Sequence, residues 1–127
     1  MPENHLFEYA VIRVVPRVER EEFLNVGVIL YCRQEKFLSL KFIIDKDKLT
    51  LFCPGCEVDM LTQNLAALNE ICAGSQIGGP IAMLDAASRF RWITATRSTI
   101  VQASKVHPGL CADAAQTLDK LYTQLVL

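Results

Sequence analysis

The chain has 127 residues, of which 51% are hydrophobic and 21% are charged, and its net charge is −1 at pH 7. A disordered chain would be poorer in apolar residues and richer in net charge, so we expect a single folded domain over residues 1–127. A net charge this close to zero also gives no broad positive field for non-specific nucleic-acid binding.

The apolar runs of the chain are short. The longest, residues 26–32 and 38–44, fall well below the roughly 20 residues that a membrane-spanning helix needs. The N-terminus, Met1-Pro2-Glu3-Asn4-His5, lacks the basic and apolar regions of a signal peptide. Five cysteines cannot all pair within one chain. These features predict a cytoplasmic protein that does not associate with membranes and has reduced thiols.

The first half of the chain is predicted to form three strands. Residues 6–15 are rich in β-forming side chains and end at Pro16, which cannot donate to a strand ladder. Residues 23–32 alternate in the manner of a strand. Their apolar face contains Leu24, Val26, Val28, Leu30 and Cys32. Residues 37–44 follow after a short charged turn. Their apolar face contains Leu38, Leu40, Phe42 and Ile44. Short connections favour an antiparallel arrangement.

The second half is predicted to be mainly helical. From Glu57 the apolar residues recur at helical spacing, and Gly74 follows at a typical C-terminal cap position. These residues are Val58, Leu61, Leu65, Leu68 and Cys72. A shorter segment runs from Ile81 to about Ser88, and residues 98–104 read as a fourth strand. A last helix follows the break at residues 107–109. Its apolar face contains Ala114, Leu118, Leu121 and Leu125.

The order β-β-β-α-α-β-α predicts an α+β fold. We expect an antiparallel sheet of about four strands with two to three helices packed on one face.

Residues 20–28 combine charged side chains in a turn with an amide inside an apolar strand. Asn25 must find hydrogen-bond partners in that strand, because an unpaired buried amide costs about 1–3 kcal/mol. Gly27, on the same face, often marks a place where another group approaches the backbone. One interpretation is a pocket floor at Asn25 with Arg20 and Glu22 at its rim. The other is a solvated turn, with Asn25 tying neighbouring strands together.

Residues 88–102 contain three arginines around Trp92. Such arginines can bind an anion bidentately or stack on a base, but they can equally be exposed side chains at the edge of a core element. The segment Arg97-Ser98-Thr99 either presents a charge and hydroxyls to a phosphate or forms a turn held by local hydrogen bonds.

Cysteine spacing suggests two further hypotheses. The C-x-x-C pair Cys53 and Cys56, together with His107 and Cys111, matches a four-ligand zinc set. The same pair at a helix N-terminus instead suits thiol redox chemistry. The third interpretation is a Pro-Gly turn flanked by ordinary thiols. We expect no metal and no cofactor, because the gap between the two halves of the zinc set is long and no phosphate-binding loop, serine-nucleophile or zinc-protease motif occurs.

The chain resembles a bacterial family called domain of unknown function 3037. The resemblance covers nearly the whole chain and rests on specific strings, which are residues 9–16, 20–28, 89–95, 97–99, Gln102 and 106–110. Glu21 departs from the pattern, because the family tends to have glycine at that position.

The resemblance implies small proteins that are often encoded beside a HipA-like kinase, which is therefore a candidate partner. It also implies that several polar residues act together. These residues are Arg20, Glu22, Asn25, Arg97, Thr99, Gln102 and His107.

Three functions remain open from the sequence. The first is a binding or regulatory module in which Arg20 and Arg97 hold a phosphate-bearing group. The second is an enzyme acting on a phosphate ester or nucleic acid, with His107 or Glu22 as general acid or base. The third is an interaction partner of the kinase alone.

Overall fold

A computed structural model describes residues 4–95 and 100–127. The strands are β1 (His5–Val14), β2 (Leu24–Cys32), β3 (Phe37–Phe42), β4 (Val101–Ala103) and β5 (His107–Cys111). The helices are α1 (Lys46–Phe52), α2 (Val58–Ala73), α3 (Ala86–Thr94) and α4 (Ala114–Leu125). Three short 3-10 turns occur at Val18–Arg20, Gln76–Gly78 and Pro80–Met83.

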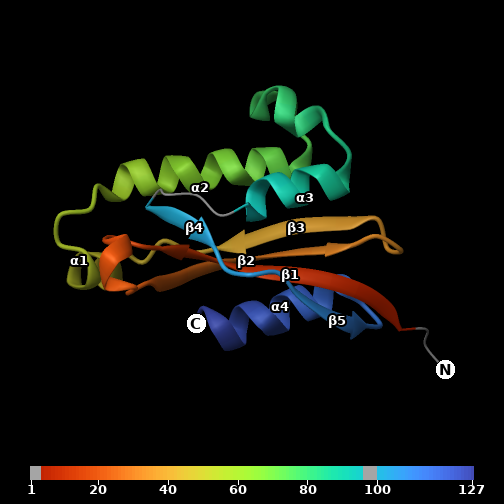
Figure 1. Cartoon of the computed structure of the whole chain (residues 1–127), viewed down its shortest axis with the longest axis horizontal. Helices are drawn as coiled ribbons and strands as arrows, with labels where there is room; N and C mark the ends of the chain where they lie inside the picture. Colours follow the sequence, from red (N-terminus) through yellow and green to blue (C-terminus); the bar gives the residue numbers. More distant parts are fainter. Residues whose placement is uncertain (1–3, 96–99) are drawn as a thin grey trace.

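The five strands form one antiparallel sheet in the order β3-β2-β1-β4, and β5 also pairs with β1 (Figure 1). Strand β1 is long enough for β4 and β5 to share its outer edge. Strand β4 pairs with Ile12–Val14, and β5 pairs with His5–Tyr9. The sheet therefore brings the end of the chain back to its beginning.

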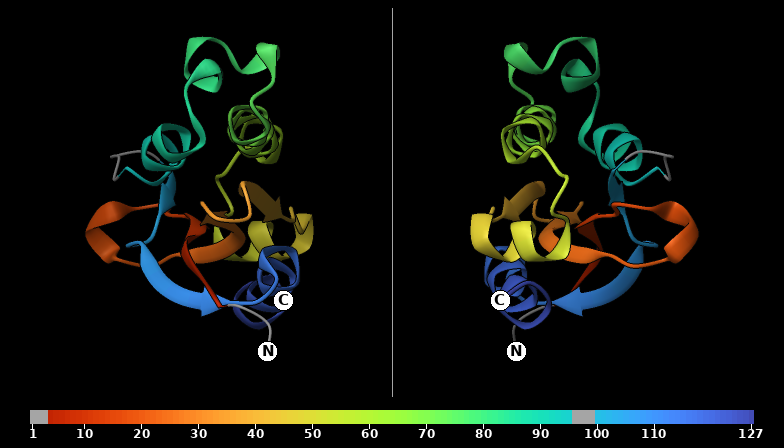
Figure 2. Two further views of the ribbon diagram at one scale, coloured as in Figure 1. Left: turned by 90° about the vertical axis from the view of Figure 1, so that its right-hand side faces the viewer. Right: turned by 90° about the vertical axis from the view of Figure 1, so that its left-hand side faces the viewer.

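Helices cover both faces of the sheet. Helices α2 and α3 lie on one side and α4 lies on the other (Figures 1 and 2). The α+β antiparallel class is confirmed. The structure differs from the prediction in having five strands and four helices among the described residues, and in having helices on both faces. A sheet with apolar side chains on both faces needs a cover on each side.

Strand β2 contains the reason for this difference. Val28, Leu30 and Cys32 face α4, whereas Leu24 and Val26 belong to the core beneath α2. A β-bulge between Ile12 and Arg13 of β1 shifts the register. A bulge adds one residue to one strand, so the alternation changes phase there. The prediction that all five side chains share one face is therefore wrong.

Ser104 lies between β4 and β5 in the chain, and it continues the hydrogen bonding along the edge of β1. Its backbone N–H donates to the Val11 carbonyl at 2.8 Å, and its Oγ accepts from the Val11 N–H at 2.8 Å. The Ser104 hydroxyl also donates to the Lys105 carbonyl at 2.9 Å. Ser104 is buried, so its hydroxyl replaces a backbone acceptor that β1 lacks at this point.

We expect Ser104→Ala to lower the free energy of unfolding by about 1 kcal/mol or somewhat more, because the buried Val11 N–H then has no acceptor. Urea denaturation at constant pH measures this change. Ser39→Ala on β3 is the control and should change stability by less than about 0.5 kcal/mol. Equal effects of the two substitutions would contradict this role of the Ser104 hydroxyl.

Candidate functional site

The two sequence stretches that carry the candidate residues meet along β1. The Val15 N–H donates to the Ile100 carbonyl at 2.6 Å, and Val14 lies opposite Val101. Strand β1 therefore lies between the start of β2, which contains Asn25, and β4, which contains Gln102. Residues more than 70 positions apart in the sequence become neighbours across this strand.

A row of polar residues crosses the sheet at Arg13. Asn25 on β2 and Gln102 on β4 both lie opposite Arg13 in the strand register. Residues directly opposite in an antiparallel ladder point to the same face. Here that face is the one that α4 covers, but α4 packs on β2 and β3. The row Asn25–Arg13–Gln102 therefore lies at the border between the covered and the uncovered part of this face.

Arg13 is the central residue of this row. Its guanidinium carbon lies 3.9 Å from the centre of the Phe23 ring, which is a cation–π contact. Its Nε is buried without a hydrogen-bond partner, and no carboxylate forms a salt bridge with it in residues 4–95 and 100–127. Burial lowers the pKa of Arg13 from its usual value. A half-buried cation without a counter-ion is a favourable place for an anion.

Asn25 ties the sheet to the end of α4. Its Nδ2 donates to the Leu125 carbonyl at 3.0 Å, whereas its Oδ1 is buried and has no partner in the described part of the chain. The first contact is made to helix α4 and not to a neighbouring strand, so it does not support the interpretation that Asn25 ties strands together. The second leaves one acceptor beside Arg13 unused.

Gly27 is not part of a pocket floor. Because of the bulge, Gly27 lies opposite Ile12 while Asn25 lies opposite Arg13, so the two residues face opposite sides of the sheet. A Cβ on Gly27 would lie 2.8 Å from the Lys41 carbonyl oxygen. The group that approaches this glycine is the backbone of β3, and the absence of a side chain permits that approach.

His107 lies on the same face as Arg13 but further along the sheet. It is exposed at the start of β5 opposite Tyr9, and the two rings are 5.3 Å apart. Tyr9 is four residues from Arg13 along β1, which corresponds to about 13 Å. One small anion therefore does not reach both His107 and Arg13.

Arg20 and Glu22 lie elsewhere, in the turn after β1. The Arg20 Nε donates to the Glu22 carboxylate, and both side chains are exposed. They line a cavity of about 630 Å³ together with Arg17 and the Cys53–Cys56 disulfide. Asn25 and Gln102 do not line this cavity. Arg97 and Thr99 lie outside the described residues, so the structure brings together only part of the predicted set.

The four residues of the zinc hypothesis do not come together. Cys53 and Cys56 form a disulfide, and Cys56 packs against the core beneath α2, whereas Cys111 belongs to the core beneath α4. The prediction of reduced thiols is therefore wrong for this pair. Cys56 directly precedes Glu57, the N-cap residue of α2, so the redox hypothesis stays a prediction.

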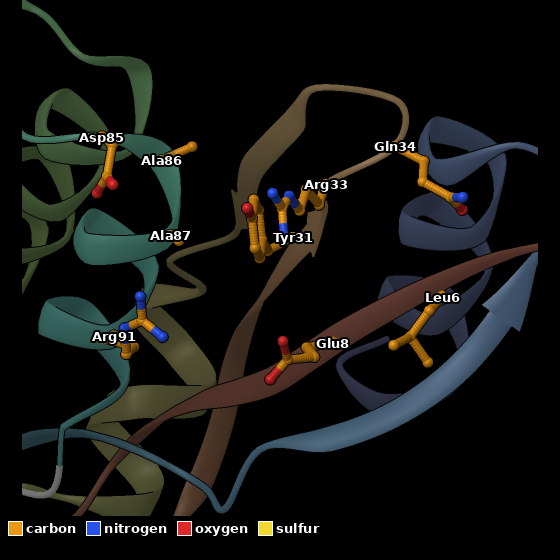
Figure 3. A pocket seen from close by; sticks show the side chains of 9 residues that line it. All are labelled: Leu6, Glu8, Tyr31, Arg33, Gln34, Asp85, Ala86, Ala87 and Arg91. Carbon is orange, nitrogen blue, oxygen red and sulfur yellow. The ribbon is translucent and has the colours of Figure 1, made fainter.

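A second cavity, of about 720 Å³, lies between α3 and the β2–β3 turn (Figure 3). Arg91 on α3 and Arg33 beside Tyr31 line opposite sides of it. Two carboxylates, Glu8 and Asp85, also line it, and Asp85 accepts a hydrogen bond from the Ser88 N–H at the start of α3. The cavity therefore contains equal numbers of positive and negative side chains and does not select an anion by charge.

Comparison with known families agrees with the resemblance seen in the sequence. The family model DUF3037, described as a protein of unknown function, matches residues 9–126. The chain belongs to this family. No curated protein and no solved structure matches it significantly. No helix in the described ranges is both long and apolar enough to cross a membrane.

Glu21, in the turn between β1 and β2, has a left-handed backbone. Glu21 has a φ of 57°, in the region that glycine adopts without steric cost. A side chain in this region costs roughly 1–2 kcal/mol. The turn between β1 and β2 therefore has a backbone geometry that glycine would adopt at lower cost.

Proposed function

We propose that this DUF3037 protein is a binding module that recognises a phosphate-bearing ligand at Arg13. The proposed site is the sheet surface that β1, β2 and β4 form beside α4. The observation that carries the proposal is the half-buried Arg13 guanidinium, which has no carboxylate partner in the described chain, on a residue that lies opposite Asn25 and Gln102 in the strand register. Sequence reasoning missed Arg13, although a charged residue inside the apolar run 9–15 was the signal.

The chemistry of the row suits a phosphate ester. A guanidinium binds phosphate oxygens through two parallel N–H donors, and the Phe23 ring limits the directions in which Arg13 can point. The unused Asn25 Oδ1 accepts a hydrogen bond and therefore favours a ligand with a hydroxyl or amino group near its phosphate. A nucleotide, a sugar phosphate and a phosphorylated peptide all meet these requirements.

The prediction that Arg20 and Arg97 hold the phosphate-bearing group has less support at Arg20 than the proposal for Arg13 has. Arg20 is already paired with Glu22, so an anion must compete with a carboxylate that is always present. Arg97 and Thr99 remain candidates from the sequence, because β4 begins two residues after Thr99.

The enzyme hypothesis also has less support than binding. Glu22 is held by Arg20 in the turn after β1, whereas His107 lies against Tyr9 on β5. A general acid and a general base that act as a pair must both reach the reacting group, and these two residues lie at different parts of the molecule.

The HipA-like kinase remains a proposed partner, and a phosphorylated segment of such a kinase would be one ligand of the Arg13 surface.

The test is a binding measurement with inorganic phosphate, nucleotides, a sugar phosphate and a phosphopeptide as probes. A ligand at 100 times its dissociation constant adds about 2.7 kcal/mol of stability, which thermal unfolding detects. Calorimetry then gives the affinity. We expect Arg13→Gln to weaken binding by about 30-fold or more, because removing one partner of a buried charge pair costs about 2 kcal/mol or more. Arg13→Lys should restore only part of the affinity.

Controls separate binding from folding. Arg33→Gln removes an exposed arginine from the cavity between α3 and the β2–β3 turn, and it should leave binding unchanged. Without ligand, Arg13→Met should be as stable as the wild-type protein or more stable, because it removes a half-buried cation that has no carboxylate partner in the described chain. If every probe fails to bind, or if Arg13→Gln binds as tightly as the wild-type protein, the proposal is wrong.

A further inference from the structure

Four metal-binding side chains meet at the opposite end of β1 from Arg13. His5 begins β1, Cys32 ends β2, Glu35 lies in the β2–β3 turn and Cys111 ends β5. The register of the sheet explains the meeting, because His5 lies directly opposite Cys111 and β2 runs antiparallel beside β1. Three separate parts of the chain therefore supply the four donors, because Cys32 and Glu35 are only three residues apart.

Glu35 is the centre of the group. Its Oε2 lies 3.1 Å from His5 Nδ1, 3.7 Å from Cys32 Sγ and 3.6 Å from Cys111 Sγ. The donor atoms of His5, Cys32 and Glu35 all lie within 4.8 Å of one another. Both cysteines are buried, while the His5 and Glu35 side chains keep 22% and 23% of their surface exposed, which leaves a path for an ion.

The distances from Glu35 to the other three donors match the ligand spacing around a tetrahedral ion. Zinc bonds of about 2.0–2.3 Å place neighbouring ligand atoms about 3.6 Å apart, which is close to the three distances from Glu35. Two thiolates with an imidazole and a carboxylate suit zinc, whereas calcium and magnesium prefer oxygen ligands alone. Without an ion, the same contacts are a hydrogen-bonded cluster in which two weak thiol donors share one carboxylate.

We propose that His5, Cys32, Glu35 and Cys111 form a structural zinc site. Four protein ligands leave no open position, which is typical of a structural rather than a catalytic site. Glu35 Oε1 also accepts a hydrogen bond from the Ala114 N–H at 3.0 Å, so the first turn of α4 orients the carboxylate. Zinc binding displaces the protons of both thiols to solvent, and it ties β1, the β2–β3 turn and β5 together.

The experiment titrates the full chain with zinc and with cobalt in the presence of a non-thiol reductant. We expect one equivalent of either ion to bind, and the cobalt complex to show the intense visible absorption of a tetrahedral thiolate site. His5→Gln and Cys32→Ser should each weaken zinc binding at least about tenfold, since even outer-shell partners of a metal site contribute that much. Competition with a chromophoric chelator measures the affinity.

Three controls distinguish this site from the other thiols. The reductant also opens the Cys53–Cys56 disulfide, so the double variant Cys53→Ser/Cys56→Ser must still bind zinc. His107→Gln must also bind zinc, because the set predicted from sequence, with His107, Cys53 and Cys56, shares only Cys111 with the proposed site. Cys72→Ser changes a buried cysteine in the α2 core and should not affect binding.

The outcome does not depend on a single variant. If Cys32→Ser fails to fold by circular dichroism, His5→Gln at the partly exposed ligand decides the question. No binding of zinc by the wild-type protein would overturn the proposal. So would binding that His5→Gln leaves unchanged, or binding that disappears in the Cys53/Cys56 double variant or in His107→Gln.

Discussion

Replacing Leu65 by alanine should lower the free energy of unfolding by about 2–5 kcal/mol. Leu65 lies in the middle of α2 and has no exposed surface. Its side chain belongs to the core that α2 forms with β1, β2 and β3, where Leu61 and Ile29 are also fully buried. Removing the branched end of the side chain leaves a cavity that this packed layer cannot close, so the lost transfer free energy and the cavity both count.

Urea denaturation of the two proteins measures this effect. Leu51→Ala is the matched control, because Leu51 also lies in a helix but has 85% of its surface exposed. The control should change stability by less than about 0.5 kcal/mol. A loss below about 1 kcal/mol for Leu65→Ala would show that α2 does not pack on the sheet as described.

Replacing Gly27 by valine should destabilise the protein by about 3 kcal/mol or more, at the upper end of the range for overpacked sites. A Cβ at this position would lie 2.8 Å from both the Lys41 carbonyl oxygen and Phe42 Cβ, and the β-branched side chain adds two further methyl groups. The first of these neighbours is backbone, so β2 and β3 must move apart. Replacing glycine lowers the entropy cost of folding by only about 0.5–1 kcal/mol, which is less than the cost of the clash. The net effect of the substitution is therefore destabilising.

The control for Gly27 is Gly55→Val. A Cβ on Gly55 would meet nothing within 4 Å, so this substitution adds the same side chain without a clash. Thermal unfolding of both variants beside the wild-type protein gives the comparison. If Gly27→Val were as stable as Gly55→Val, the close approach of β3 to Gly27 would be incorrect.

The elements with clear periodicity were predicted well. The apolar side chains of β3 lie against the α2 core as expected, and α2 buries Leu61, Leu65 and Cys72 and ends at Gly74 in the left-handed region. Helix α4 was also expected. Each of these elements repeats its apolar residues at the spacing of one regular structure, so neighbouring residues suffice to identify it.

Two elements were missed because their sequence signals are not periodic. Strand β5 contains Pro108 and Gly109, which usually break a strand. Pro108 is tolerated because β5 pairs with β1 alone and is an edge strand. Helix α1 is only seven residues long, and its N-cap Asp45 was the one signal for it. Both elements depend on tertiary pairing or packing more than on local preference.

For the candidate site, too, the sequence predicted single residues but not how they come together. The sequence identified Asn25 as an amide that needs partners, and the family resemblance implied that Gln102 and His107 act together with it. It did not show that Asn25 and Gln102 lie on either side of Arg13, because strand register and the β1–β2 bulge are properties of the paired chain. The cluster around Glu35 was missed for the same reason, since His5 and Cys111 are distant in sequence from Cys32 and Glu35.

The sequence by itself determined the α+β class, the antiparallel strands of the first half, the long helix α2 and membership of the DUF3037 family. These follow from side-chain periodicity and from motif strings, both of which are local. Only the tertiary structure decided that helices cover both faces, that the bulge opposite Arg13 sends Asn25 and Gly27 to opposite faces, and that Cys111 lies with His5 and Glu35. Those facts depend on which strands pair and in what register, and burial of both faces of the sheet fixes that register over the whole fold.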